Sequence, residues 1–193
     1  MRRTDLEHII RAAGDIADDD ELIIIGSQAI LAQHPDAPPG LLMSMEADLW
    51  PKSRPERADL VDGSIGEGSP FHETYGYYAQ GVGPQTARLP RDWMKRLVPI
   101  RNANTRGVTG WCLEAHDLAL SKYVAGRPKD LDYTRTMVRS ALLQKKKLLD
   151  RLPTMGLDAA HVRLVAGRIE RDFSETTAAP EKERTRKPRR GTR

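Results

Sequence analysis

The stretch Glu21-Leu-Ile-Ile-Ile-Gly26-Ser27-Gln-Ala-Ile-Leu-Ala-Gln33 decides the fold. Its four consecutive apolar residues, 22–25, predict a short strand that is buried on both faces and therefore central in a sheet. Gly26 follows the strand directly, and residues 27–33 are compatible with two helical turns. Junctions of a strand, a glycine and a helix are common in α/β proteins, so this stretch predicts that class of fold.

The same junction has a functional interpretation. A glycine lets the backbone approach a ligand closely, and the amides that open a helix form a ready site for a phosphate. Gly26 and Ser27 are therefore candidate phosphate-binding residues. The alternative is an ordinary connection without a ligand.

A second strand is predicted over residues 41–50, closed by Pro51. In its segment Ser44-Met45-Glu46-Ala47-Asp48-Leu49, Glu46 and Asp48 are two residues apart and would point to the same face. Two adjacent carboxylates raise one another's pKa unless a cation lies between them, and Mg²⁺ accepts oxygen ligands from protein and nucleotide together. The alternation of apolar and polar residues is equally typical of a half-exposed strand.

The third segment of interest is Leu118-Ala-Leu-Ser-Lys122-Tyr-Val-Ala-Gly-Arg127-Pro-Lys129-Asp130. Lys122 lies among apolar neighbours on a predicted helix, while Arg127, Lys129 and Asp130 cluster where the next helix begins. Basic groups beside a carboxylate-bound metal would suit triphosphate binding and phosphoryl transfer. Alternatively, Asp130 only caps the second helix, and Arg127 and Lys129 are solvent charges.

The remaining pattern completes a mixed α/β unit over residues 1–113. A capping box, Thr4-x-x-Glu7, predicts an N-terminal helix, and residues 55–65 predict another. Further strands are expected over residues 75–82, 97–100 and 108–113. From residue 114 to residue 173 the pattern is helical, with helices over about 116–124, 128–143 and 158–173. We therefore expect a mixed twisted sheet flanked by helices, with a helical C-terminal extension.

The net charge of +4 has its source in residues 174–193, which carry seven Lys or Arg and three Glu. This segment has too few apolar residues for a core and is expected to be a disordered basic tail. It would attract nucleic acid by releasing counterions, or it would act only as a solubilising extension.

Several classes of protein are disfavoured. No apolar run is long enough to cross a bilayer, and because no apolar stretch follows Met1 we do not expect a signal peptide there. The single cysteine, Cys112, excludes an internal disulfide, agrees with a cytoplasmic location and is expected to be a small buried hydrophobe. His72-Glu73 lacks the second histidine of a zinc helix. No nucleophile elbow supports a hydrolytic triad of Ser27, His116 and Asp117.

Taken in order, the three segments resemble the minimal nucleotidyltransferase family of the polymerase-β superfold. More narrowly, they are similar to the AbiEii/MenT-type nucleotidyltransferases, which are often the toxin halves of toxin–antitoxin pairs. The resemblance covers residues 22–143 and implies the nucleotidyltransferase fold. It also implies roles for nine residues of this chain. Glu46 and Asp48 would bind Mg²⁺ or Mn²⁺; Gly26, Ser27, Ser44, Lys122, Arg127 and Lys129 would bind the nucleotide; Glu46, Asp48, Lys122 and Asp130 would be catalytic.

Two departures accompany this resemblance. Glu46 stands where the family usually has Asp, and the gap between Ser27 and Glu46 is longer than usual. The superfold often adds a third carboxylate from a later strand, for which Glu73 and Glu114 are the candidates. The function implied is transfer of a nucleoside monophosphate from an NTP to an acceptor hydroxyl. The implied acceptor is the 3′ end of tRNA, and the implied partner is a cognate antitoxin. The alternative is a catalytically inactive module that binds nucleotide, RNA or a protein.

Overall fold

Five strands form one mixed sheet in the order β3-β2-β1-β5-β4. The computed structural model describes residues 1–178. Strand β1 runs parallel to β5 and antiparallel to β2, β2 runs parallel to β3, and β4 runs antiparallel to β5. The central position of β1 confirms the prediction from its continuous apolar run. The strands are β1 (Glu21–Ile24), β2 (Glu46–Pro51), β3 (Tyr78–Gly81), β4 (Val98–Ile100) and β5 (Thr109–Cys112).

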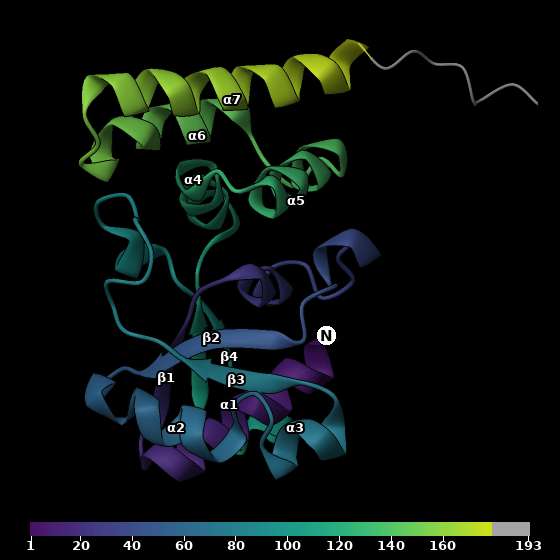
Figure 1. Ribbon diagram of the computed structural model, residues 1–193, viewed down its shortest axis with the longest axis vertical. Coiled ribbons are helices and arrows are strands. Elements are labelled where there is room, and N and C mark those ends of the chain that lie inside the picture. Colours follow the sequence, from purple (N-terminus) through teal and green to yellow (C-terminus); the bar gives the residue numbers. More distant parts are fainter. Residues whose placement is uncertain (179–193) are drawn as a thin grey trace, which may run out of the picture.

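Three helices cover one face of the sheet (Figure 1). They are α1 (Arg3–Ala17), α2 (Ala58–Ile65) and α3 (Pro70–Tyr75). Helix α1 forms because Leu6, Ile9, Ile10 and Ala13 recur at helical spacing, and all four are fully buried. This layer fixes which face of β2 is apolar and leaves the other face for polar side chains.

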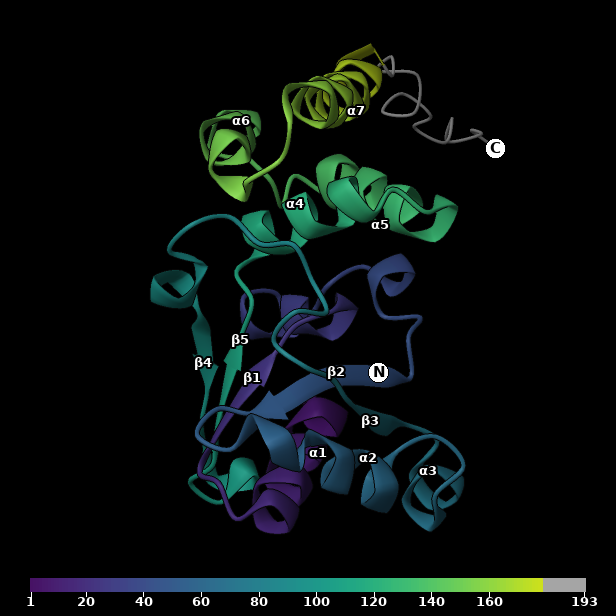
Figure 2. The same ribbon diagram turned by 60° about the vertical axis from the view of Figure 1, so that its left-hand side comes forward.

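The opposite face is covered by short 3-10 turns, beyond which the C-terminal helices lie (Figure 2). The chain passes from β1 into η1 (Ser27–Ala32) and from β5 into α4 (Ala115–Ala125), so both segments start at the same edge of the sheet. The elements of this side are η1, η2 (Pro39–Leu41), α4, α5 (Pro128–Arg139), α6 (Lys145–Arg151), η6 (Leu152–Met155) and α7 (Ala159–Ala178); η3 (Pro55–Arg57), η4 (Trp93–Arg96) and η5 (Ala103–Thr105) are short turns elsewhere.

A buried polar contact joins the C-terminal helices. The Tyr123 hydroxyl of α4 donates to Asp172 of α7 at 2.8 Å, and the Thr134 hydroxyl of α5 donates to the same carboxylate oxygen at 3.3 Å. A polar group buried in this way specifies how the helices pack, because leaving it unpaired costs about 1–3 kcal/mol. The predicted fold class, a mixed sheet flanked by helices with a helical extension, is therefore confirmed.

Two predicted strands were wrong in their extent. The strand expected over residues 41–50 begins only at Glu46, because Pro38 and Pro39 lead into the turn η2 and the chain straightens after it. The strand expected over residues 75–82 begins at Tyr78. The residues before it form α3, since Ser69 accepts a hydrogen bond from the His72 amide and Gly76 ends the helix at φ +74°.

The helix boundaries also differ from the prediction. Helix α1 begins before Thr4, and Asp5, not Glu7, accepts a hydrogen bond from the Arg2 amide at 2.7 Å. Helix α5 ends at Arg139 rather than near residue 143, and Ala141, which follows the helix, adopts a left-handed conformation. Helix α7 continues past residue 173 to Ala178. The rest of the expected tail, residues 179–193, lies outside the described residues.

Cys112 is free and completely buried, as predicted, and burial raises the pKa of its thiol to about 12. Within residues 1–178, no helix combines the length and the apolar character that a bilayer crossing requires.

Candidate functional site

A cavity of about 720 Å³ lies between the polar face of β2 and the helices α4 and α5. It contains eight of the nine predicted site residues, which come from four separate stretches of the chain. These are Ser27, Ser44, Glu46, Asp48, Lys122, Arg127, Lys129 and Asp130. The ninth, Gly26, lines an adjoining cavity of about 250 Å³ that shares Asp48, Lys122 and Arg127 with the first.

Gly26 packs directly against the Asp48 carboxylate. A Cβ atom at this position would lie 1.9 Å from Asp48 Oδ2, and the backbone has a φ of +69°, which side chains other than hydrogen disfavour. The Ile25 amide also donates to the Asp48 carbonyl at 2.9 Å. The glycine is therefore required by the neighbouring strand, a reason that the sequence alone does not reveal.

The two carboxylates of β2 face the cavity together. Ala47 and Leu49, which alternate with them, are fully buried on the opposite face. Burial, followed by the negative charge of Glu46, raises the pKa of Asp48, although Lys122, Lys129 and Arg127 act in the opposite direction. The repulsion expected from the sequence is thus present at Asp48.

Tyr78 of β3 holds the other carboxylate. It pairs with Glu46 across the two strands, and its hydroxyl donates to Glu46 Oε2 at 3.2 Å. Burial, followed by the charge of Glu46, raises the pKa of Tyr78 to about 12. Tyr78 therefore remains a hydrogen-bond donor at neutral pH and fixes the longer glutamate side chain.

The cations on the other side of the cavity are organised by Asp130. Its carboxylate lies 3.1 Å from Lys122 Nζ and 2.6 Å from Arg127 Nε, and it is buried. Burial alone would raise the pKa of Asp130, but the hydrogen bond from Arg127 and the charge of Lys122 outweigh it, so the pKa is lowered. Asp130 is thus an anion that orients two cations, which the simple capping alternative does not explain.

Two hydroxyl groups bind the backbone around the cavity, and one of them joins separate segments. The Tyr133 hydroxyl of α5 donates to the Ser27 carbonyl at 2.6 Å, and the Lys122 ammonium lies 5.5 Å from the centre of the Tyr133 ring. Ser44 Oγ accepts from the Glu46 amide at 3.2 Å. Helix α5 is therefore attached to the turn that follows β1. Sequence reasoning missed Tyr133 because a tyrosine on a helix carries no signal of a partner 106 residues away.

Neither candidate for a third carboxylate lines the cavity. Glu73 is an exposed residue of α3. Glu114 caps α4 by accepting from the His116 amide at 3.1 Å and binds Arg151 at 2.5 Å, away from the cavity. The position beside Asp48 on β3 is occupied by Gln80, which lines the cavity. The strand register that brings Gln80 there is not visible in the sequence.

The hydrolytic triad does not form. His116 Nδ1 lies 2.6 Å from Glu114, and its Nε2 accepts from the Gln144 amide at 3.0 Å, so both ring nitrogens are occupied. Asp117 is paired with Arg96 at 2.8 Å and with Arg151 at 2.7 Å. This cluster joins α4 to the surrounding segments and leaves Ser27 without a base.

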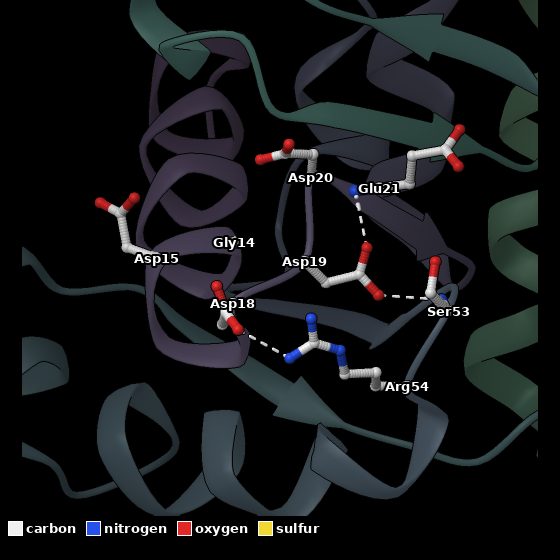
Figure 3. A pocket seen from close by; sticks show the side chains of 8 residues that line it. All are labelled: Gly14, Asp15, Asp18, Asp19, Asp20, Glu21, Ser53 and Arg54. Carbon is white, nitrogen blue, oxygen red and sulfur yellow. Dashed lines mark hydrogen bonds and ion pairs between the residues drawn. The ribbon is translucent and has the colours of Figure 1, made fainter.

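A second acidic region lies at the opposite end of β1 (Figure 3). Here Asp18, Asp19 and Asp20 form a segment that we call the acidic turn, beside a cavity of about 530 Å³. Asp19 accepts from the Glu21 amide at 3.0 Å and from the Ser53 amide at 2.8 Å, while Asp18 binds Arg54 at 2.7 Å. These carboxylates serve the backbone and an arginine. Among the described residues, no group of three or more His, Cys, Asp or Glu is arranged to hold a metal.

The carboxylate pair fits a divalent cation better than the acidic turn does. Glu46 and Asp48 present oxygen atoms, which Mg²⁺ and Mn²⁺ prefer, and a cation would offset both the burial and the repulsion from Glu46 that raise the pKa of Asp48. The nearby lysines and arginine would complement phosphate groups.

Comparisons with curated proteins and with solved structures find no match. Because the family model described as "nucleotidyltransferase of unknown function (DUF6036)" matches residues 4–173, which is most of the chain, the protein belongs to this nucleotidyltransferase family.

Proposed function

We propose that the protein is a metal-dependent nucleotidyltransferase that transfers a nucleoside monophosphate from an NTP to an acceptor hydroxyl. The observation that carries the proposal is one cavity in which Glu46 and Asp48 face the cations Lys122, Arg127 and Lys129. Separate segments supply opposite charges to one space, as binding a cation together with a polyphosphate requires. Membership of a nucleotidyltransferase family supports the same chemistry.

Each residue has a role that follows from its position. Glu46 and Asp48 would hold Mg²⁺ or Mn²⁺, which when bound supplies positive charge to the phosphates and withdraws electrons from the α-phosphorus. Lys122 and Arg127 would neutralise phosphate charge, with Asp130 orienting both, and Lys129 would add a third cation. Gly26 and Ser27 would let the backbone approach the phosphates, and Ser44 would hold the start of β2 through the Glu46 amide.

The transfer balances simply. The acceptor oxygen forms a bond to the α-phosphorus, and the bond between the α-phosphorus and the oxygen bridging to the β-phosphate breaks. Pyrophosphate leaves with that electron pair, and the hydroxyl proton passes to water. The cations near the phosphates stabilise the charge that develops on the leaving group.

The acceptor and the biological setting belong to the proposal as well. The likeness to AbiEii/MenT-type enzymes supports a tRNA 3′ end as acceptor and a cytoplasmic toxin controlled by a cognate antitoxin. The basic residues 174–193 support an RNA acceptor, because they add attraction to phosphates without requiring a sequence.

The test uses the full chain with each of the four α-labelled NTPs, Mg²⁺ and total tRNA. We expect labelled RNA with the natural sequence and a loss of at least about a hundredfold in Glu46→Gln and Asp48→Asn. Glu73→Gln is the matched control, because Glu73 is an exposed carboxylate outside the cavity.

No label on any RNA or protein acceptor, together with intact NTP binding, would instead indicate the inactive binding module. If Glu73→Gln lost as much activity as Glu46→Gln, the assignment of the carboxylate pair would be wrong. Thermal melting of every variant separates a loss of chemistry from a loss of folding.

A further inference from the structure

We propose that Gln80 supplies the third protein oxygen of the cation site, so that the cation binds this cavity as a complex with the nucleotide and only weakly to the protein alone. This inference rests on the proposed function, since it concerns the same cavity. It assigns a role to a neutral residue and names the ligand, a metal–nucleoside triphosphate complex.

The strand register places Gln80 beside the carboxylate pair. Strands β2 and β3 run parallel, with Glu46 opposite Tyr78 and Asp48 opposite Gln80. Residues opposite one another in neighbouring strands point to the same face and are about 5 Å apart. The hydrogen bond from Tyr78 to Glu46 shows that these two side chains lie on the same face of the sheet. Asp48 and Gln80 both line the cavity.

The side-chain amide of Gln80 is free to bind a ligand. Within the described residues it forms no hydrogen bond, whereas the cavity-lining residues Glu46, Asp130 and Tyr133 are all paired. Its neighbour Ala79 is fully buried on the opposite face, which fixes the direction of the Gln80 side chain. An amide oxygen is an accepted ligand for hard divalent cations.

The number of oxygen ligands that the protein offers explains why the neutral Gln80 amide matters for cation binding. The protein offers two carboxylates and one amide at the cation position, and the cations Lys122, Arg127 and Lys129 lie across the same cavity. Mg²⁺ requires about six oxygen ligands. Two carboxylates and one amide supply only part of this set, whereas the phosphates of a nucleotide would supply the missing oxygens and further negative charge. The described residues include no larger acidic group that could hold the cation by itself.

The experiment measures binding, not turnover. Mn²⁺ alone, and then Mn²⁺ with the α,β-methylene analogues of ATP, GTP, CTP and UTP, are titrated into the full chain and followed by calorimetry and by the Mn²⁺ paramagnetic resonance signal. We expect weak binding of Mn²⁺ alone and at least about tenfold tighter binding when the preferred analogue is present.

Three variants assign the effect to Gln80. In Gln80→Glu, Mn²⁺ alone should bind about tenfold tighter than in the natural sequence, because a negatively charged carboxylate replaces a neutral amide beside the cation. In Gln80→Ala, binding of the Mn²⁺–nucleotide complex should weaken by about threefold to tenfold. Gln85→Glu adds the same charge on the loop after β3, outside the cavity, and should change neither affinity.

The outcomes separate this inference from the proposed function. Equal effects of Gln80→Glu and Gln85→Glu, or tight binding of Mn²⁺ alone to the natural sequence, would overturn the role of Gln80. If Glu46→Gln still abolished labelling of RNA in that case, the proposed function would stand. Absence of nucleotide binding would overturn the proposed function and the nucleotide part of the inference, while Mn²⁺ binding to Gln80→Glu would still decide whether Gln80 lies beside the cation.

Discussion

Two acidic regions lie at opposite ends of β1, and their environments differ. In the acidic turn, Asp19 accepts hydrogen bonds from two backbone amides. The hydrogen bond from Arg54 lowers the pKa of Asp18. In the cavity, Asp48 lies against Gly26 and near Glu46, and burial raises its pKa. Carboxylates that are paired with amides or an arginine of the protein stabilise the fold. A buried carboxylate that is repelled by a second carboxylate is suited to bind a ligand.

Replacing Gly26 should have the largest effect on the cavity. In Gly26→Ala the new methyl group would collide with Asp48 Oδ2 and strain the backbone at φ +69°. We expect nucleotidyl transfer to fall by at least about a hundredfold, since displacing a reacting group by 1 Å costs that much. The measurement is labelling of RNA beside thermal melting.

Gly156→Ala is the matched control for strain. Gly156 has a φ of +66° and open space where a Cβ would lie, so only the backbone cost of roughly 1 kcal/mol applies. Equal activity losses in both alanine variants would show that contact between Gly26 and Asp48 is not important.

Glu114 extends the comparison, because its carboxylate is paired with both His116 and Arg151. Burial opposes its charge, but hydrogen bonds from His116 and Arg151 prevail and lower its pKa to about 2 from the ordinary 4.5. Its contribution to stability is therefore complete above pH 4.5 and is lost as the pH falls toward 2. We expect this contribution to be roughly 3 kcal/mol.

Urea unfolding of the natural sequence and of Glu114→Gln, between pH 2.5 and pH 6, measures this contribution. The advantage of the natural sequence should shrink as the pH falls. An advantage that stays constant over that range would mean that ionisation of Glu114 does not stabilise the fold.

Removing one carboxylate from each region should have opposite effects on stability. Asp19→Ala leaves two amides unpaired and should destabilise the fold by about 2 kcal/mol without changing nucleotidyl transfer. The raised pKa of Asp48 means that its charged form is disfavoured by folding, so stability falls as the pH rises through that pKa. Asp48→Asn should therefore stabilise the metal-free protein at pH 7 and abolish transfer.

Denaturant midpoints at pH 7 in the presence of a chelator provide the test. If Asp48→Asn destabilised the protein as much as Asp19→Ala does, the difference between the two regions would disappear.

Arg54→Ala should have the smallest effect. The pair between Arg54 and Asp18 is exposed, with 79% of the Asp18 side chain accessible, and exposed ion pairs contribute little. We expect an unchanged melting temperature and unchanged transfer. A clear loss of stability would mean that the acidic turn depends on Arg54 as well as on the amides bound by Asp19.

The sequence determined the central strand, the face of β2 that carries Glu46 and Asp48, and the order of the segments. These features depend on local periodicity, because an apolar run or an alternation of two residues can be recognised without knowing the partner strand. The same local signals placed Lys122 and Asp130 on consecutive helices. Eight of the nine predicted residues meet in one cavity, and Gly26 lines the adjoining one, while their roles remain predictions.

Only the tertiary structure decided which residues complete that cavity. The register of β2 and β3 brings Gln80, and not Glu73 or Glu114, beside Asp48. The packing of α5 against the turn after β1 brings Tyr133 to Ser27, and the fit of Gly26 against Asp48 explains the glycine. Each of these contacts joins segments far apart in the chain. Such contacts depend on how strands pair and helices pack, and local sequence patterns do not record either.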